Sequence, residues 1–124
     1  MASTILVRAL GSAGVTRAVA DSSWRRGRLL VLCYHSVSLR DEHLWNPGLY
    51  ITEARLRSRF EQLRDDGYRV LPLDEALRRL YSGTLPPRAV ALTFDDGTTD
   101  FGVRVAPLLE EFDYPATLYL TTYY

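Results

Sequence analysis

The stretch that decides the fold is Val90-Ala91-Leu92-Thr93-Phe94-Asp95-Asp96-Gly97. Together with Ala89, its first five residues make a short and almost wholly apolar run, which is typical of a strand buried on both faces. Asp95-Asp96-Gly97 follows directly and has the chemistry of a turn. The sequence therefore predicts a buried strand over residues 89–94, with two carboxylates at its carboxyl end.

Outward from this strand, strands and helices are expected to alternate along the chain. The expected strands cover residues 29–34, 68–71, 89–94 and 116–120. The strand over residues 29–34 is also a continuous apolar run and is likewise expected to be buried on both faces. The expected helices lie between Thr52 and Gly67, between Asp74 and Gly83, and from Phe101 to Phe112. Residues 37–51 contain polar and turn-forming residues and are expected to form a loop. This alternation predicts an α/β fold with a mainly parallel sheet and right-handed crossovers.

The helix after Thr52 has the clearest local signals. Thr52 is a good N-cap residue, since its hydroxyl can accept a hydrogen bond from the first turn. Leu56, Phe60 and Leu63 recur at three- and four-residue steps and form one apolar face. Gly67 suits the left-handed position that follows many helices. These signals bound the helix at both ends.

The other two helices carry weaker signals. Asp74 is expected to cap the second helix, whose apolar face includes Leu77, Leu80 and Tyr81. Pro107 falls within the third helix, so it must lie in the first turns or produce a kink.

Polar side chains follow two of the expected strands where each one ends. His35 and Ser36 follow the first strand, and Asp95, Asp96 and Asp100 follow the strand over residues 89–94. In parallel α/β proteins, functional groups gather at this carboxyl edge of the sheet. Two adjacent carboxylates repel each other in a poorly solvated cleft, and a bound cation or a shared proton relieves that cost. These residues are therefore the candidate site.

Each candidate also has a plain structural interpretation. Asp-Asp-Gly is ordinary turn chemistry, and a histidine at a strand end, such as His35, can simply be hydrogen-bonded. His43 lies in a polar loop and is expected to be structural. Cys33 is the single cysteine, which excludes an intrachain disulfide, and its apolar neighbours predict a small buried hydrophobe.

Composition fits an ordinary globular protein. The chain has 124 residues, of which 47% are hydrophobic and 24% charged, and its net charge is zero. It is long enough for one small domain or part of a larger one, and it is not disordered in bulk. All fifteen basic residues are arginine, which we attribute to codon usage rather than to binding. No nucleic-acid partner is expected.

Residues 1–28 form a basic leader with Asp21 as the one acidic residue. Ile5, Leu6, Ala9 and Leu10 have helix-like spacing, and a loose connector is expected at Gly11-Ser12-Ala13-Gly14. The apolar run at residues 4–7 is broken by Arg8, so no clear signal peptide is predicted. A cytoplasmic location or attachment to the inner membrane surface is expected. The leader is interpreted either as a solvated, frayed end or as a membrane-surface contact.

Four segments, in order along the chain, resemble the polysaccharide deacetylase family (the NodB-homology domain, carbohydrate esterase family 4). Residues 32–38, Leu-Cys-Tyr-His-Ser-Val-Ser, look like its opening strand, and residues 93–97 match its first motif, Thr-Phe-Asp-Asp-Gly, without a departure. The helix and strand pattern of residues 60–77 is also similar. Residues 114–120 are close to the family's usual Val-Pro-Ala-Thr-Phe-Phe. The resemblance covers about residues 29–122.

The resemblance implies both a fold and a reaction. Such proteins fold as a distorted (β/α) barrel and remove N- or O-acetyl groups from polysaccharides. By that similarity, Asp95 would be the general base, and Asp96 would bind a divalent metal, with zinc the expected ion. His35 and Asp100 are candidate pocket residues beside them. The expected partner is an acetylated polysaccharide, and residues 29–124 would be the N-terminal part of the domain, about half a barrel.

The chain departs from the family pattern in one important respect. The family completes its metal site with two histidines from a second motif, but His35 and His43 are the only histidines here, and neither matches. A full barrel needs on the order of 250 residues. We therefore expect a truncated chain with little or no deacetylase activity by itself. Two alternatives stay open: the same fold acting on an O-acetyl ester or a small amide, and a non-catalytic glycan-binding or interaction module.

Overall fold

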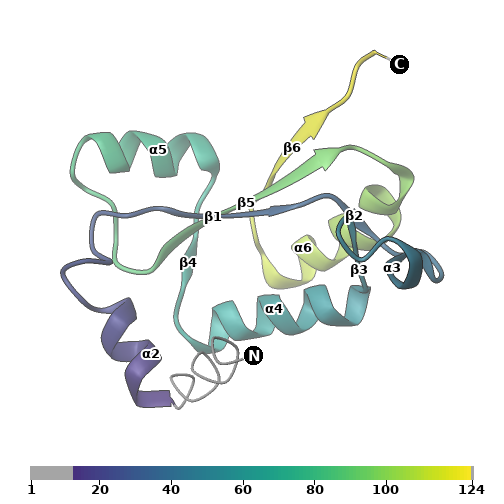
Figure 1. Ribbon diagram of the computed structural model, residues 1–124. Helices are drawn as coiled ribbons and strands as arrows, with labels where there is room; N and C mark the ends of the chain where they lie inside the picture. The colour runs from purple at the N-terminus through teal and green to yellow at the C-terminus, as the bar shows by residue number, and fades with distance from the viewer. Residues whose placement is uncertain (1–12, 124) are drawn as a thin grey trace.

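The computed structural model describes residues 13–123, with a four-stranded parallel sheet at the centre (Figure 1). Its strands are β1 (Leu30–Tyr34), β4 (Arg69–Val70), β5 (Ala89–Asp96) and β6 (Thr117–Leu120). The central strand, β5, pairs with β1 along one side, and with β4 and then β6 along the other. Every pairing is parallel, which confirms the predicted α/β class. Within the described residues the sheet is open, with β1 at one edge.

The connections between these strands contain the helices and a second, two-stranded sheet. The helices are α2 (Ala13–Ala20), α3 (Glu42–Trp45), α4 (Glu53–Asp65), α5 (Leu73–Tyr81) and α6 (Ala106–Phe112), the last preceded by a π-helical segment η1 (Phe101–Val105). The small sheet pairs β2 (Ser36–Val37) with β3 (Tyr50–Ile51), also in parallel. Among the described residues, no helix combines the length and apolar character that a membrane crossing requires.

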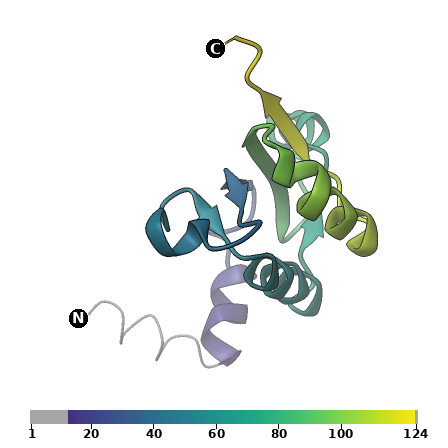
Figure 2. The same ribbon diagram turned by 90° about the vertical axis from the view of Figure 1, so that its right-hand side faces the viewer.

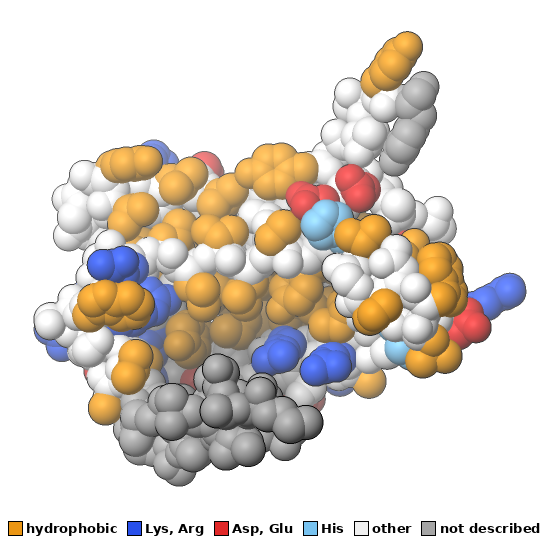
Figure 3. Space-filling view, viewed as in Figure 1, with side chains coloured by type: hydrophobic (Ala, Val, Ile, Leu, Met, Phe, Trp, Pro, Cys, Tyr) orange, Lys and Arg blue, Asp and Glu red, His pale blue; other side chains and the backbone are white. Residues whose placement is uncertain are grey.

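The two faces of the main sheet are covered unequally. On one face Val90, Leu92 and Phe94 of β5 are buried in a cluster with residues of α4, η1 and α6. The alternate β5 residues point to the other face, where α5 covers the amino-terminal half (Figures 1 and 2). Figure 3 shows a band of hydrophobic side chains across the middle of the molecule, along the β1 edge of the sheet. The second face is partly open to solvent around β1, where alternate residues are exposed.

This difference in helix cover explains why the burial predicted for β5 was right and the burial predicted for β1 was wrong. The first six residues of β5 are all buried, as predicted. In β1, by contrast, Leu32 and Tyr34 pack against the core, whereas Val31 and Cys33 are exposed. The prediction that β1 is buried on both faces was wrong. On the second face α5 packs on β5, and no described helix covers β1.

The local signals for α4 are confirmed. The Thr52 hydroxyl accepts a hydrogen bond from the backbone N–H of Arg55 at 3.1 Å, which caps the helix. Leu56, Phe60 and Leu63 are buried against the sheet. Pro107 lies in the first turn of α6, just after the π-helical segment, as its missing N–H requires.

The cap predicted for α5 was wrong, and the predicted apolar face was wrong in part. Pro72 is the N-cap, with φ −53° already close to the helical value, and Asp74 lies inside the first turn. Ala76 is the buried residue of this helix, whereas Tyr81 is 86% exposed and Leu77 is also exposed. The helix meets the sheet through a small side chain, while Leu80 is half-buried and Leu77 and Tyr81 face solvent.

Residues 37–51 are more ordered than the predicted loop. They contain α3 and the β2–β3 pairing, in which Ser36 lies opposite Tyr50 and Val37 opposite Ile51. Two-residue strands and a one-turn helix are too short to show hydrophobic periodicity, so they could not be predicted from the sequence pattern.

The leader prediction can be compared with the structure only from residue 13 onward. The helix expected around Ile5 to Leu10 lies outside the described residues. Ala13 and Gly14, expected in a loose connector, instead begin α2. The segment after α2 is tied to the body, because the Arg88 guanidinium forms a two-point ion pair with Asp21, with Nη2 2.7 Å and Nε 2.9 Å from its two oxygens. This pairing lowers the pKa of Asp21 below its usual value.

Candidate active site

The pairing of β1 with β5 determines which side chains meet at the carboxyl edge. Cys33 pairs with Thr93 and Tyr34 with Phe94, so the next residue along β1, His35, comes beside Asp95. Side chains two residues apart in a strand point to the same face. Cys33, His35 and Asp95 therefore share the face that α4 and α6 do not cover.

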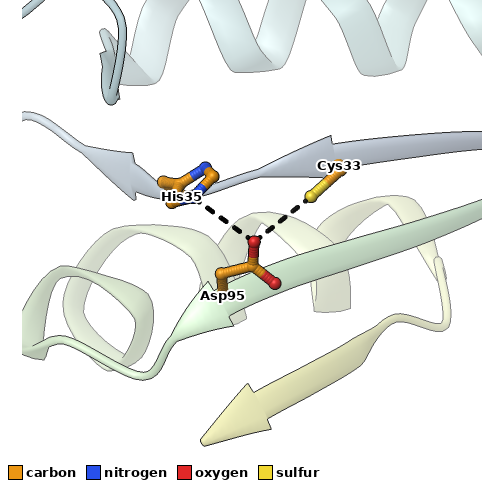
Figure 4. A group of neighbouring side chains, drawn as sticks. All are labelled: Cys33, His35 and Asp95. Carbon is orange, nitrogen blue, oxygen red and sulfur yellow. Dashed lines mark hydrogen bonds and ion pairs between the residues drawn. The ribbon is translucent and has the colours of Figure 1, made fainter. Parts of the chain in front are cut away.

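These three side chains converge on one oxygen atom (Figure 4). The Sγ of Cys33 donates to Oδ2 of Asp95 at 3.4 Å, and Nε2 of His35 also lies 3.4 Å from that oxygen. The side chains of His35 and Asp95 are 40% and 30% exposed. Asp95 thus presents a carboxylate that solvent or a ligand can reach, with a thiol and an imidazole beside it.

Asp96 has a different environment. The predicted strand end at Phe94 was wrong, because β5 continues to Asp96, where Asp95 pairs with Tyr119 and Asp96 with Leu120 of β6. This added ladder satisfies backbone groups that a turn would have left free. The Asp96 carboxylate accepts a hydrogen bond from the Thr121 hydroxyl at 3.4 Å. The structure therefore directs the two neighbouring aspartates toward different partners.

Gly97 makes the turn that follows this pair. It has φ +71°, directly after Asp96 with φ +72°. A Cβ atom at this position would collide with the side chain of Leu120. Glycine is needed both for its left-handed backbone and for the space it leaves.

Asp100 lies in a buried hydrogen-bond network. Its side chain is almost fully buried, and its Oδ2 accepts from the backbone N–H of Val37 at 2.7 Å. Its Oδ1 accepts from the Thr98 hydroxyl, which lies 3.3 Å from the hydroxyl of Ser36. Both carboxylate oxygens are thus engaged. The network fastens the β1–β2 junction, next to His35, to the loop that follows β5.

Two further residues, His43 and Cys33, can be compared with what the sequence predicted for them. His43 hydrogen-bonds with Ser38, whose hydroxyl oxygen accepts from the His43 backbone N–H at 3.0 Å and lies 3.0 Å from Nδ1. Cys33, predicted to be a buried hydrophobe, is exposed and lies in the site. Its spacing of two from His35 in a strand was the signal that could have placed it there.

The described residues do not complete a metal site around Asp96. A zinc site normally needs three protein ligands, and Asp96 belongs to no such group within residues 13–123. The group of three ligand-type side chains found there is Cys33, His35 and Asp95, whose ligand atoms lie within 4.8 Å of one another.

Comparisons with known proteins show which proteins the chain resembles. The sequence profile of the family described as polysaccharide deacetylase matches residues 82–124. The poly-beta-1,6-N-acetyl-D-glucosamine N-deacetylase of Escherichia coli K12 is 33% identical over 100 residues, covering 79% of this chain and 14% of that protein. Residues 82–124 thus match the polysaccharide deacetylase family, and the similarity to a protein named as such a deacetylase extends over most of the chain.

Solved structures of polysaccharide deacetylases share the fold. The Streptococcus pyogenes deacetylase PplD, solved in complex with acetate, has a TM-score of 0.68 and 30% identity over 76% of this chain and 42% of its own. A de-N-acetylase from Aggregatibacter actinomycetemcomitans has a TM-score of 0.62 and 34% identity over 73% of this chain and 36% of its own. The chain therefore spans less than half the length of these relatives.

Proposed function

We propose that this chain supplies part of the active site of a metal-dependent hydrolase that removes acetyl groups from the nitrogen atoms of a polysaccharide. The observation that carries the proposal is the solvent-reachable Asp95 carboxylate at the carboxyl end of β5. It lies in a Thr-Phe-Asp-Asp-Gly motif within a fold shared with deacetylases. The E. coli relative is named for an N-acetylglucosamine polymer, which makes such a polymer the first substrate to test.

In the proposed reaction Asp95 is the general base. Its carboxylate takes a proton from a water molecule as the water oxygen bonds to the acetyl carbon. When the amide C–N bond breaks, the acetyl group leaves as acetate, and the sugar nitrogen takes up a proton to leave as an amine. His35, whose Nε2 lies 3.4 Å from Oδ2, helps to hold this carboxylate in place.

A divalent metal is part of the proposal. Such an ion, with zinc expected, would polarise the acetyl carbonyl. Asp96 is the proposed carboxylate ligand, and its other ligands would have to come from outside the described residues. We also propose that the open sheet forms part of a distorted (β/α) barrel. The free edge of β1 and its uncovered face support this, since a neighbouring strand and helix would satisfy both.

Acetate release from a poly-β-1,6-N-acetylglucosamine oligomer by the full-length protein tests the function. Asp95→Asn keeps the size of the side chain but removes the base, and it should lower turnover at least about 100-fold. Asp74→Asn is the matched control, because that carboxylate is 80% exposed on α5, and it should leave turnover unchanged. Absence of acetate release by the unmodified protein, or full activity of Asp95→Asn, would overturn the proposal. An O-acetylated glycan run in parallel separates amide from ester hydrolysis.

A second candidate is a glycan-binding module without catalysis. It is favoured by the incomplete ligand set at Asp96 and by the exposed Trp45, whose ring centroid lies 5.8 Å from that of the half-buried Tyr50. Aromatic rings of this kind can stack on sugars. Oligosaccharide binding that changes tryptophan fluorescence, without any acetate release, would favour this second function.

A further inference from the structure

The Cys33–His35–Asp95 cluster contains the three ligand types that zinc accepts most readily. Thiolate sulfur, imidazole nitrogen and carboxylate oxygen all bind zinc, and three protein ligands with one open position are typical of a reactive or exchangeable site. The three ligand atoms come from neighbouring parallel strands and lie within 4.8 Å of one another. The deacetylase proposal gives Cys33 no role.

The spacing of these atoms is close to that of a zinc coordination shell. Zinc–ligand bonds of about 2.0–2.3 Å place the ligands of a tetrahedral ion about 3.3–3.8 Å apart. Two of the separations here, Sγ to Oδ2 and Nε2 to Oδ2, are both 3.4 Å. The third is no more than 4.8 Å, so a side-chain adjustment of at most about 1.5 Å closes the shell.

The site is also accessible and held in register. Cys33 is exposed, and His35 and Asp95 are 40% and 30% exposed, so a hydrated ion can approach. The hydrogen-bonded ladder that pairs Cys33 with Thr93 fixes the strands on which the ligands lie. The buried network of Asp100 fixes the backbone just beyond His35. The backbone therefore needs no rearrangement for an ion to bind.

We propose that Cys33, His35 and Asp95 form a second metal site, which takes a thiophilic divalent ion such as zinc or cadmium and is distinct from the site at Asp96. On binding, the Cys33 thiol proton leaves to solvent and the ion takes its place between Sγ and Oδ2. Neutral imidazole supplies the third ligand and a water molecule the fourth. Thiolate coordination separates this site chemically from any site built on Asp96, which has carboxylate oxygen alone.

The site has a consequence for the reaction, and this consequence rests on the proposed function. An ion bound to Oδ2 of Asp95 blocks the carboxylate that would accept the proton of water. Thiophilic ions in excess should therefore inhibit the deacetylase through Cys33.

Cobalt(II) titration of the purified 124-residue chain tests the site directly. A thiolate ligand gives cobalt an intense near-ultraviolet charge-transfer band, which carboxylate and imidazole ligands do not give. The unmodified chain should show this band, and zinc should displace it. Cys33→Ser should abolish the band and weaken zinc binding at least about tenfold in competition with a chromophoric chelator. Asp74→Asn, at an 80% exposed carboxylate of α5, is the matched control and should keep both the band and the zinc affinity within about twofold.

Protection of the thiol gives a second readout that does not depend on colour. Cys33 is the only cysteine, so the rate of its reaction with a thiol reagent reports on it alone. Zinc should slow that reaction at least about tenfold in the unmodified chain, but not in Asp95→Asn, which lacks a ligand. No band and no protection, or zinc binding that Asp96→Asn removes and Cys33→Ser keeps, would overturn the second site. Either result leaves acetate release, and so the proposed function, to be judged separately.

Discussion

Asp95 and Asp100 lie five residues apart at the same end of the same sheet, yet their surroundings differ in almost every respect. Asp100 is buried, and both of its oxygens accept hydrogen bonds, from the Val37 backbone and the Thr98 hydroxyl. Asp95 is partly exposed, and the contacts of its Oδ2 with Cys33 and His35 are both 3.4 Å long. A fully satisfied carboxylate holds a structure together, whereas one with spare acceptor capacity is free to take a proton or an ion.

The role of a carboxylate near a motif is therefore indicated by its hydrogen-bond partners and not by its position in the sequence. Both aspartates were candidates for the same pocket. The structure gives one of them the hydrogen bonds that fasten the loop, and it leaves the other facing solvent. The buried hydrogen bonds of Asp100 therefore help to hold the backbone beside the exposed site at Asp95.

The largest effect on stability is expected from removing the buried carboxylate. Asp100→Ala leaves the Val37 N–H without its acceptor inside the protein and deletes a charge-assisted hydrogen bond. The free energy of unfolding should fall by about 3 kcal/mol, measured by urea denaturation. Thr99→Ala, at an exposed position of the same loop, should change it by no more than about 0.5 kcal/mol. Equal losses in the two variants would mean that the buried network is not what holds the loop.

A smaller loss of stability is expected from a substitution of Gly97, in the turn between Asp95 and Asp100. Gly97→Ala puts a Cβ atom on a residue with φ +71° and against the side chain of Leu120. The free energy of unfolding should fall by about 1–2 kcal/mol. Gly102→Ala is the control, since a Cβ there meets no atom within 4 Å and φ is not positive. A thermal shift of Gly97→Ala no larger than that of the control would contradict this account of the turn.

The smallest effect should come from the second hydrogen bond to Asp100. Thr98→Val keeps the shape of the side chain but removes the hydroxyl that donates to Oδ1 and contacts Ser36. We expect a loss of about 1 kcal/mol in the free energy of unfolding. Combined with Asp100→Ala, it should add little, because both variants break the same network. Full additivity in that double-mutant cycle would show that the two groups act independently.

Much of the fold could be predicted because its signals are local and repeated. The apolar run at β5, the Thr52 cap and the spacing of Leu56, Phe60 and Leu63 all place their elements correctly. The errors arose where neighbours in space decide the outcome. β5 runs on to Asp96 because β6 pairs with it, and the β2–β3 pairing involves two residues on each side.

Only part of the candidate site could be predicted from the sequence, for the same reason. The Asp-Asp-Gly motif identified Asp95 and Asp96 by residue type and position. Their separation onto different partners depends on the ladder with β6, and the exposure of Cys33 depends on which face of the sheet is covered. Neither property can be read from an apolar run, because such a run does not show what packs against it.

The most direct test of the account measures activity and stability together in Asp95→Asn and Asp100→Asn of the full-length protein. Asp95→Asn should lower acetate release at least about 100-fold and leave the free energy of unfolding within about 0.5 kcal/mol. Asp100→Asn should lower the free energy of unfolding by about 1–2 kcal/mol and keep turnover per folded molecule within about tenfold. An active Asp95→Asn variant, or a stable Asp100→Asn variant without turnover, would contradict the assignment of chemistry to Asp95 and of structure to Asp100.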